Sequence, residues 1–396
     1  MISVDEAISR ITAAVAPVES ESVALEAAHR RVLAQDALAQ VDQPPAPVSA
    51  MDGYAVRLAD AGRAGAVLRV MGVAPAGQPF PGSIGAGEAV RIFTGGILPQ
   101  GADAIVIQED VDVRADEIVL RAPAEARHIR AAALDFSKGD VLVRAGRRLT
   151  ARDLALIAAG DVARVHVRRK PLVAFAATGD ELARPGEAHR PGGIVASSGY
   201  ALAALIETWG GEQLDLGILP DSIEAIERLP QRAARADAVV TMGGASVGDH
   251  DLVQRALGPK GFQLDFWKIA MRPGKPLIFG RLNGKPFVGL PGNPVSSFVC
   301  ATLFLQPLIA ALLGTAIEHH YKTARLSGAL RANDSRQDYI RARLFLRDGD
   351  LWAEPFAIQD SSMQSALARA DALIVRAPHA PAVGEGNAVE IIPLAE

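Results

Sequence analysis

The sequence predicts a multidomain protein that combines an α/β sheet domain with two all-β parts, an inserted small β module and a C-terminal β-barrel. Three patterns carry this prediction. Strand-like and helix-like segments alternate over residues 171–318, short turn-punctuated strands fill residues 44–135, and period-2 alternation dominates residues 319–396. Alternating strands and helices imply a mostly parallel sheet that helices cover on both faces.

The β module interrupts an N-terminal part of mixed structure. Residues 1–43 contain two helical patterns, "VDEAISRITAAV" and "ALEAAHRRVLAQ", and a further helix is predicted to begin after Thr150, a residue type suited to an N-cap. We therefore expect residues 1–43 and 136–170 to form one discontinuous α/β domain. The strands of residues 44–135 are short and separated by Gly, Pro and Asp, which is typical of a small barrel or sandwich.

The α/β domain has a regular order along the chain. Strands are predicted at 171–179, 212–219, 237–244 and 262–271, and a hairpin at 275–293. Helices are predicted at 198–210, at 221–236 with Asp221 as the cap, at 249–257, and over the long apolar stretch 294–312. In such sheets, ligands bind at the carboxyl ends of the strands, so each turn at those ends is a candidate site.

The loop "TMGGASVGDHD" after the strand at 237–244 raises a specific question. Gly243 and Gly248 have the spacing of the two glycines in a phosphate-binding loop, but Asp249 and His250 stand where such a loop carries Lys and Ser or Thr. The loop itself contributes Asp249 and Asp251, and the other strand-end turns contain Asp180, Glu181 and Asp221, and also Lys268, Arg272 and Lys275. One rim of the sheet is therefore expected to carry both acids and cations.

This combination favours a site for an elongated polyanion handled with a divalent metal. Glycines let backbone amides approach phosphate oxygens, helix N-termini favour negative charge, and Mg²⁺ takes one or two carboxylates together with phosphate oxygens. Structural alternatives exist for each feature by itself. Asp221 is also a suitable N-cap, Lys275 a suitable exposed turn residue, and Asp180 and Glu181 suitable helix-start charges.

Composition limits the class of protein. The formal net charge of −4 gives no global positive field for nucleic acid, and the single cysteine, Cys300, excludes an intrachain disulfide. The N-terminus lacks the basic start and apolar core of a signal peptide, and no stretch is expected to reach the ~20 apolar residues of a membrane span. We expect a cytoplasmic protein that binds neither nucleic acid nor membrane.

Six motifs in this order carry a family resemblance: "SAMDGYAVR", "RIFTGGILPQGADAIVIQE", "TGDEL", "GGASVGDHD", "KIAMRPGKPLIFG" and "GLPGNPVSS". Together they resemble the molybdopterin molybdenumtransferase family, which comprises MoeA and the gephyrin E-domain. The resemblance implies four domains, with residues 171–318 as the molybdopterin-binding fold. It also implies a homodimer whose active site joins this fold to the β module of the partner subunit.

The implied reaction is insertion of molybdenum from molybdate into adenylylated molybdopterin with release of AMP, assisted by Mg²⁺. Carried over position by position, the implied catalytic residues are Asp52, Thr94, Asp135, Glu181, Asp221, Asp251, Lys268, Arg272 and Lys275. The implied substrate-binding residues are Gly243, Gly244, Ser246, Gly248, Pro291, Gly292, Asn293, Arg341 and Ser361, and the implied metal ligands are Glu181, Asp221 and Asp251.

Two segments depart from the family pattern. "IRAAALDF" replaces an Arg-rich stretch before Asp135, and "ASSGY" (residues 196–200) stands where an Asn-containing segment is usual. Two other functions are compatible with a similar sheet domain: adenylylation of molybdopterin, and a gephyrin-like assembly scaffold. A molybdopterin adenylyltransferase and recipient molybdoenzymes are the partner proteins that the resemblance implies.

Overall fold

The computed structural model describes residues 1–188, 190–243, 247–316 and 321–394, without the side chains of residues 247–251. The chain divides into two compact units. Unit 1 comprises Met1–Glu21, Arg30–Ala34 and Val167–Glu396, and unit 2 comprises Ser22–His29 and Gln35–His166. The finer division into four domains at residues 43, 135, 170 and 318 stays a prediction.

Unit 1 is built on a six-stranded sheet with the order β16-β13-β17-β21-β20-β18. β16, β13, β17 and β21 are parallel neighbours, and β20 is antiparallel to both β21 and β18. The predicted hairpin at 275–293 is confirmed, because Asn283 and Gly284 both have positive φ in the two-residue turn between β20 and β21. The strands are β13 (Leu172–Thr178), β16 (Glu212–Leu219), β17 (Ala238–Met242), β18 (Phe262–Lys268), β20 (Pro276–Leu282) and β21 (Lys285–Leu290).

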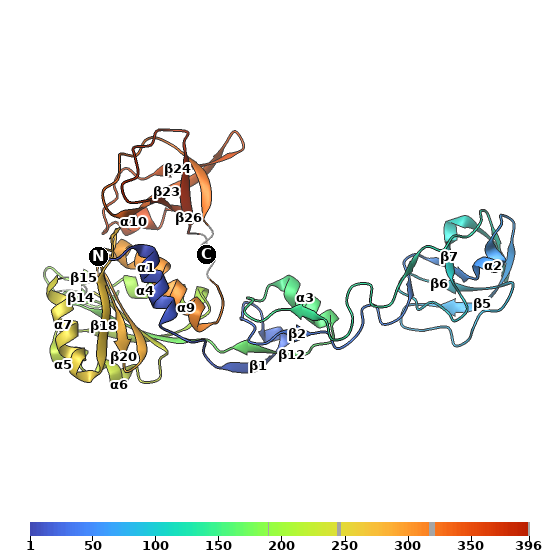
Figure 1. Cartoon of the computed structure of the whole chain (residues 1–396), viewed down its shortest axis with the longest axis horizontal. Helices are drawn as coiled ribbons and strands as arrows, with labels where there is room; N and C mark the ends of the chain where they lie inside the picture. Colours follow the sequence, from blue (N-terminus) through green and yellow to red (C-terminus); the bar gives the residue numbers. More distant parts are fainter. Residues whose placement is uncertain (189, 244–246, 317–320, 395–396) are drawn as a thin grey trace. The chain divides into compact units, whose positions relative to one another are not determined.

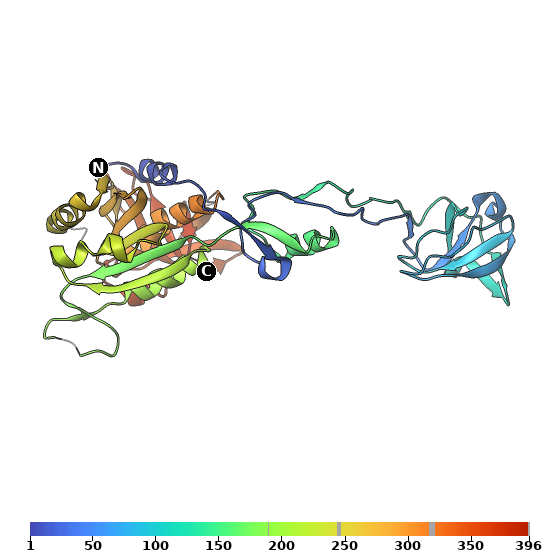
Figure 2. The same ribbon diagram turned by 90° about the horizontal axis from the view of Figure 1, so that it is seen from below.

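Helices cover both faces of this sheet, as predicted (Figure 1). Alternate residues of β13 and β17 point to two apolar cores: Phe175 and Val240 to one, Ala174 and Val239 to the other. The first core is shared with α1 (Val4–Ala13), α4 (Ser198–Thr208), α8 (Pro294–Cys300) and α9 (Gln306–Leu312), and the second with α5 (Ile223–Ile226), α6 (Leu229–Arg232) and α7 (Val247–Leu257). A ribbon that contains β14 (Leu182–Ala183) and β15 (Ile194–Val195) extends from the sheet (Figure 2).

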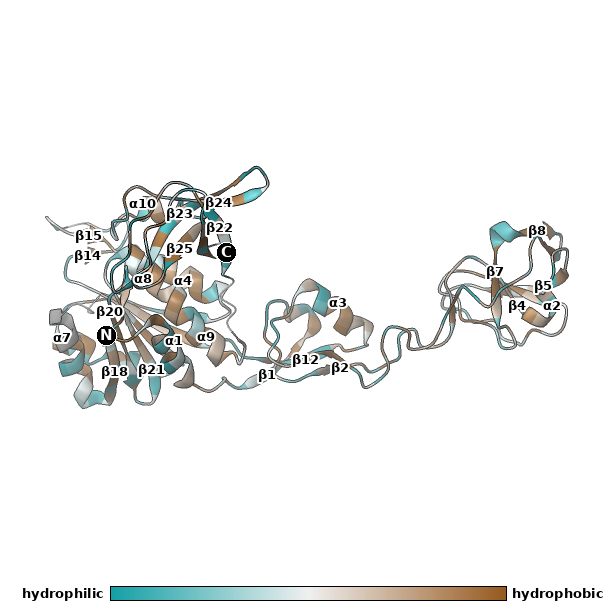
Figure 3. Cartoon of the chain, turned by 45° about the horizontal axis from the view of Figure 1, so that its top comes forward, coloured by the Kyte–Doolittle hydropathy of each residue, from teal (hydrophilic) through white to brown (hydrophobic). Residues whose placement is uncertain are grey.

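The segment Pro294–Leu312 runs through α8, a π-helical turn at Ala301–Leu305, and α9. Its length of 19 residues and its mean hydropathy of 1.9 would suffice to cross a membrane, so the expectation that no stretch reaches such a length was wrong. However, 83% of its most apolar window is buried within the protein, and its apolar residues share a core with α1 and α4. Figure 3 shows the ribbon of α8 and α9 beside these two helices.

Two predicted helices were wrong in detail. The pattern at residues 24–35 forms only a 3₁₀ turn at Leu25–Ala27, because the residues before it form strand β1 (Ser20–Ala24), which pairs with β12 (Arg164–Arg168). The segment at 221–236 contains the short helices α5 and α6. Its cap is Ser222, whose hydroxyl accepts a hydrogen bond from the Ala225 amide at 3.2 Å, and not Asp221.

The C-terminal part of unit 1 is a closed β-barrel, as predicted. β23 (Gln337–Arg347) pairs with both β24 (Asp350–Pro355) and β25 (Ala372–Arg376), and β22 (Lys322–Leu326) and β26 (Ala388–Pro393) complete the ring. Asp348 and Gly349 form the turn between β23 and β24, both with positive φ. A short strand, β19 (Met271–Arg272), joins the sheet domain to β23, and α10 (Gln364–Leu367) follows the strand β24 along the chain.

Unit 2 contains the predicted β module. Its strands form one six-stranded sheet, β7-β4-β6-β5-β9-β8, with apolar side chains such as Val56 and Ala55 in separate cores. The sheet strands are β4 (Gly53–Val56), β5 (Val67–Ala74), β6 (Glu88–Ile92), β7 (Ala104–Ile107), β8 (Val111–Arg114) and β9 (Glu117–Leu120). Smaller pairs join β2 (Ala37–Leu38) to β11 (Val141–Val143) and β3 (Val48–Ser49) to β10 (Ile129–Arg130).

Two helices belong to unit 2, α2 (Leu58–Ala61) and α3 (Ala151–Ala159). The predicted cap of α3 is confirmed. Thr150 and Asp153 form a capping box, in which the Thr150 hydroxyl accepts from the Asp153 amide and the Asp153 carboxylate accepts from the Thr150 amide.

Candidate functional site

A cleft of about 780 Å³ lies at the carboxyl ends of β13, β17 and β21. It is the position where the sequence predicted a site. Six of the predicted residues line it: Glu181, Asp221, Gly243, Pro291, Gly292 and Asn293. Its other lining residues are Ala177, Thr178, Leu182, Ile194, Val195, Ala196, Ser197, Ser198, Gly199, Met242, Pro276, Pro294, Ser296, Ser362 and Gln364.

Two glycine loops approach each other closely at the base of the cleft. Gly243 has a φ of +93°, and a Cβ atom on it would lie 2.6 Å from the carbonyl oxygen of Thr178. A Cβ on Gly292 would lie 3.6 Å from the Cα of Gly243. A side chain at position 243 would therefore clash with β13, and the bare backbone leaves room for a ligand to approach the strand ends.

The amino ends of two helices contribute to the same cleft. Ser197, Ser198 and Gly199 line it at the start of α4, and Asn293 and Pro294 line it at the start of α8. The first amides of a helix have no acceptor within the helix, and they carry the positive end of its dipole. Two such ends at one cleft favour an anionic ligand.

Two carboxylates, Glu181 and Asp221, face this cleft beside those helix ends. Glu181 folds back over its own turn, where its carboxylate oxygens lie 2.7 Å from the position of a Cβ on Gly179. Within the described part of the chain, no three acidic, histidine or cysteine side chains form a group that would hold a metal ion by themselves. Mg²⁺ typically takes only one or two carboxylates and completes its shell with phosphate oxygens and water, so these two side chains fit that ion in the presence of a phosphate ligand.

The C-terminal barrel reaches the cleft through the segment 359–363. The Ser361 hydroxyl accepts a hydrogen bond from the Asn293 amide group at 2.8 Å, and its carbonyl accepts from the Val295 amide at 3.1 Å. Arg341, which is 1% exposed, lies behind this segment and donates to Gln359 Oε1 and to the carbonyl oxygens of Asp360 and Met363. Burial lowers the Arg341 pKa. Arg341 therefore holds the segment that brings Ser361 to Asn293.

The three predicted cations of the rim have different surroundings. Arg272 is paired with Asp338 and Asp334 of the barrel, the latter at 3.3 Å. The Lys268 ammonium lies 3.9 Å from the centre of the Trp267 ring. Lys275 is exposed, and among the described residues it has no ion-pair partner; it immediately precedes Pro276, which lines the cleft. Among the described residues, Arg272 is the one of the three with an ion-pair partner, Lys268 lies over an aromatic ring, and Lys275 has neither contact.

Asp52 and Thr94 of unit 2 are brought together. Asp52 Oδ1 accepts hydrogen bonds from the Thr94 amide at 2.8 Å and the Thr94 hydroxyl at 2.9 Å. These bonds, with the positive charge of Arg91, lower the Asp52 pKa. Asp135 is exposed on a separate segment of this unit, where its amide donates to the Gln43 carbonyl at 2.9 Å.

The remaining predicted residues lie in or beside the glycine loop. Gly244 and Ser246 fall outside the described residues. Gly248 and Asp251 belong to α7, but the side chain of Asp251 is outside the description, so its role stays a prediction.

Several lining residues escaped the sequence reasoning. Thr178 is 8% exposed, and its hydroxyl has no hydrogen-bond partner among the residues that the structure describes. Ser197 and Ser198 belong to "ASSGY", the segment that departs from the family pattern. Gln364 comes from the barrel, and its amide donates to the Ser197 hydroxyl. The strand-end position of Thr178 was a usable signal, whereas no local pattern relates Gln364 to residues 167 positions earlier.

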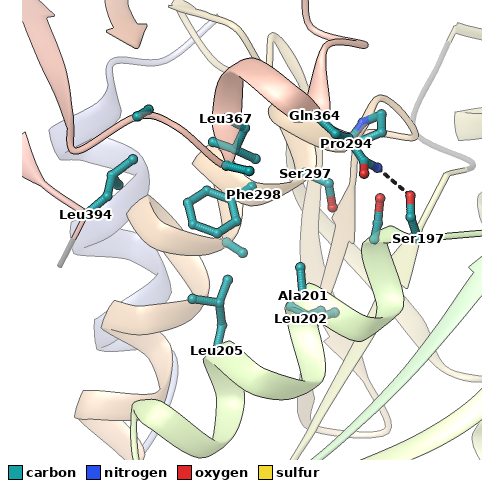
Figure 4. A pocket seen from close by; sticks show the side chains of 14 residues that line it. Ser197, Ala201, Leu202, Leu205, Pro294, Ser297, Phe298, Gln364, Leu367 and Leu394 are labelled. Carbon is teal, nitrogen blue, oxygen red and sulfur yellow. Dashed lines mark hydrogen bonds between the residues drawn. The ribbon is translucent and has the colours of Figure 1, made fainter. Parts of the chain in front are cut away.

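A second pocket of about 380 Å³ adjoins the cleft between α4, α8 and α10 (Figure 4). Ser197, Ser198, Pro294 and Gln364 line both spaces. The other residues that line this side pocket are Ala201, Leu202, Leu205, Ser297, Phe298, Ala301, Leu367, Ala368, Ala370 and Leu394. Its described lining contains no charged side chain, in contrast to the cleft.

Family models cover most of the chain. Residues 2–160 match the MoeA N-terminal region (domain I and II), residues 174–311 a probable molybdopterin binding domain, and residues 323–394 the MoeA C-terminal region (domain IV).

Individual relatives agree with these models. A molybdopterin molybdenumtransferase of Haemophilus influenzae is 35% identical over 99% of this chain and 98% of its own length. One from Nostoc is 37% identical over 84% of this chain and 78% of its own. The crystal structure of a molybdopterin biosynthesis MoeA protein from Pyrococcus horikoshii has a TM-score of 0.87 and 32% identity, with 100% of both chains covered.

Proposed function

Since this chain belongs to the MoeA family of molybdopterin molybdenumtransferases, we propose that its molybdenum insertion proceeds on adenylylated molybdopterin with release of AMP. The protein is a transferase of molybdenum cofactor biosynthesis, and molybdopterin is its substrate. We propose three further features: the substrate is adenylylated, a divalent metal assists the reaction, and the protein is a dimer.

One observation carries the proposal: the cleft joins two helix amino ends, a glycine loop and two carboxylates at one sheet edge. The helix ends and bare glycine backbone suit phosphate oxygens. The carboxylates suit a phosphate only when a cation is present, because they would otherwise repel it. A phosphoanhydride substrate accompanied by a divalent ion accounts for both sets of groups.

In this proposal Glu181, Asp221 and Asp251 would hold Mg²⁺. When bound, the ion supplies screening of phosphate charge as AMP leaves. The chain's own groups bind and orient the substrate. The amides at the start of α4 and the Ser296 amide of α8 face the phosphates, Asn293 and Ser361 form a fixed pair at the edge, and Lys275 attracts molybdate.

We also propose that the protein is a homodimer in which Asp52 and Thr94 complete the site of the partner subunit. The support is the family membership and the lowered pKa that the two hydrogen bonds from Thr94 give Asp52. A carboxylate held in one orientation suits a ligand or ion that needs an acceptor at a defined position.

The decisive experiment follows AMP release from adenylylated molybdopterin with and without molybdate. We expect molybdate-dependent release of AMP and formation of the molybdenum cofactor. Consumption of ATP with formation of adenylylated molybdopterin would instead identify an adenylyltransferase. Absence of both reactions, together with binding to other proteins, would identify a scaffold.

A further inference from the structure

We propose that the side pocket between α4, α8 and α10 binds an uncharged fused nitrogen heterocycle of the substrate, while the phosphates of the same molecule occupy the cleft. This assignment rests on the proposed function, since it takes the substrate to be adenylylated molybdopterin. That molecule carries a phosphoanhydride between two flat heterocycles, a pterin and an adenine.

The chemistry of the lining selects a neutral group. Leu202, Leu205 and Phe298 form apolar walls, and the described lining carries no side chain with a charge. A phosphate or molybdate moved into this pocket would lose its hydration without gaining an opposite charge, at a cost of several kcal/mol. An uncharged ring loses little hydration free energy, and it gains contacts with the walls and with the Phe298 ring.

Polar groups are gathered at one end of the pocket. Figure 4 shows Ser197, Ser297 and Gln364 on one side and Leu205, Leu367 and Leu394 away from them. Hydroxyls and an amide both donate and accept hydrogen bonds. The edge of a purine or pterin alternates ring nitrogens with amino or carbonyl groups, so this arrangement suits such an edge better than a plain hydrocarbon.

The pocket is continuous with the cleft, so one ligand can occupy both. Four residues line both spaces, and the hydrogen bond from Gln364 to Ser197 lies at their boundary. The pocket volume of about 380 Å³ is in the lower part of the usual range for small-molecule sites, which suits one ring system and not the entire substrate.

Two exposed alanines allow a matched test on one helix. Ala201 of α4 lines the pocket but not the cleft, and Ala201→Phe would fill the pocket without disturbing a buried position. Ala204 is exposed on the same helix and lines neither space, so Ala204→Phe is the control. Ala368→Phe approaches the pocket from the barrel side and serves as a second filling variant.

The measurement is the dissociation constant of the full-length protein for AMP, for 6-hydroxymethylpterin and for molybdate, after thermal melting has shown that each variant is folded. We expect both filling variants to weaken one of the two ring probes by about tenfold or more, and Ala204→Phe to change it by less than about twofold. Molybdate binding should stay unchanged in all three. Weakened AMP binding assigns the pocket to adenine, and weakened pterin binding assigns it to the pterin.

The proposal is overturned if both filling variants bind AMP and the pterin as the unmodified protein does, if the unmodified protein binds neither, or if Ala204→Phe weakens binding equally. These binding results do not depend on turnover. Absence of AMP release by the unmodified protein would therefore refute the proposed function separately from the assignment of the pocket.

Discussion

Asp52 accepts both of its bonds from Thr94 through a single oxygen, Oδ1, which holds the carboxylate in one orientation. Because hydrogen bonds to the charged form favour that form, the Asp52 pKa lies below its ordinary value. The bond from the Thr94 amide lowers it most, and the bond from the Thr94 hydroxyl comes next. Asp52 is therefore ionised throughout the neutral range, and the pair is lost only as pH falls through this lowered pKa.

Thr94→Val should raise the Asp52 pKa part of the way towards its ordinary value of about 3.9, because it removes the hydroxyl bond and keeps the amide bond. Thr94→Ser should leave the pKa almost unchanged. Titration of the carboxyl carbon by NMR measures both. Equal pKa values in the valine variant and the unmodified protein would mean that the hydroxyl does not bond to Asp52 in solution.

The ion pair between Arg272 and Asp338 predicts a structural role for this part of the basic rim. Asp338→Asn should lower the free energy of unfolding by about 1 kcal/mol, a value reduced for the exposure of Arg272. Asp350→Asn is the matched control in the same barrel, because its pair with Arg325 is exposed on both sides and should contribute almost nothing. Urea unfolding measures the free energy of unfolding of both variants. Equal losses in the two would argue against a stabilising ion pair between Arg272 and Asp338.

Lys275 should behave differently from Arg272. Its exposed and unpaired charge predicts that Lys275→Ala weakens molybdate binding by about tenfold while changing stability by less than about 0.5 kcal/mol. Lys170→Ala removes an exposed charge at the amino end of β13 and is the control. Calorimetric titration with molybdate provides the test, and identical affinities for both variants would exclude a role for Lys275 in binding this anion.

The metal proposal predicts a defined change at Asp221. Asp221→Asn keeps the side-chain size but removes the charge, and should raise the Mg²⁺ concentration for half-maximal AMP release by at least about tenfold. Glu207→Gln changes an exposed acid on α4, outside the cleft, and should have no such effect. Direct Mg²⁺ titration of the protein with bound AMP gives a second measurement, and an unchanged affinity in the Asp221 variant would rule out this ligand.

The shared-site proposal predicts complementation between inactive variants. Equal amounts of Asp52→Ala and Asp251→Ala protein, mixed under subunit exchange, should recover about a quarter of the unmodified activity. Half of the dimers are then mixed, and each mixed dimer has one intact site of two. The two variants alone should stay inactive. No recovery in verified mixed dimers would show that Asp52 and Asp251 act within the same subunit or in separate sites.

Local sequence patterns predicted those parts of the fold that depend on residues close together in the chain. The Thr150 cap and the hairpin from β20 to β21 follow from residue types at fixed spacing. The segment at residues 24–35 has a helical pattern because its Ala, Leu and Glu residues favour a helix. Its neighbours instead pair with a distant strand, and Arg30 adopts a positive φ that no helix allows.

For the candidate site, too, some features could be predicted from the sequence and others could not. Glu181, Asp221 and Gly243 were predictable, because the ends of parallel strands meet at one edge of a sheet. The burial of Arg341, the pairing of Arg272 with Asp338 and the bond between Gln364 and Ser197 were not. Each depends on how the barrel packs against the sheet domain, and no spacing in the sequence encodes that contact.

The apolar face of α1 has a consequence for biosynthesis. Val4, Ala7 and Ile11 are buried in a core that also contains Leu308 and Ile309 of α9, and the chain after α1 is fixed by the bond from the Val18 amide to the Leu312 carbonyl. A ribosome adds about 5–20 residues per second, so the roughly 300 intervening residues take about 15 to 60 seconds to emerge. During that time the first helix made has none of its α9 partners. Unit 2 is complete in the nascent chain well before then, so the amino-terminal helix must stay soluble while a later-made helix is translated to cover it.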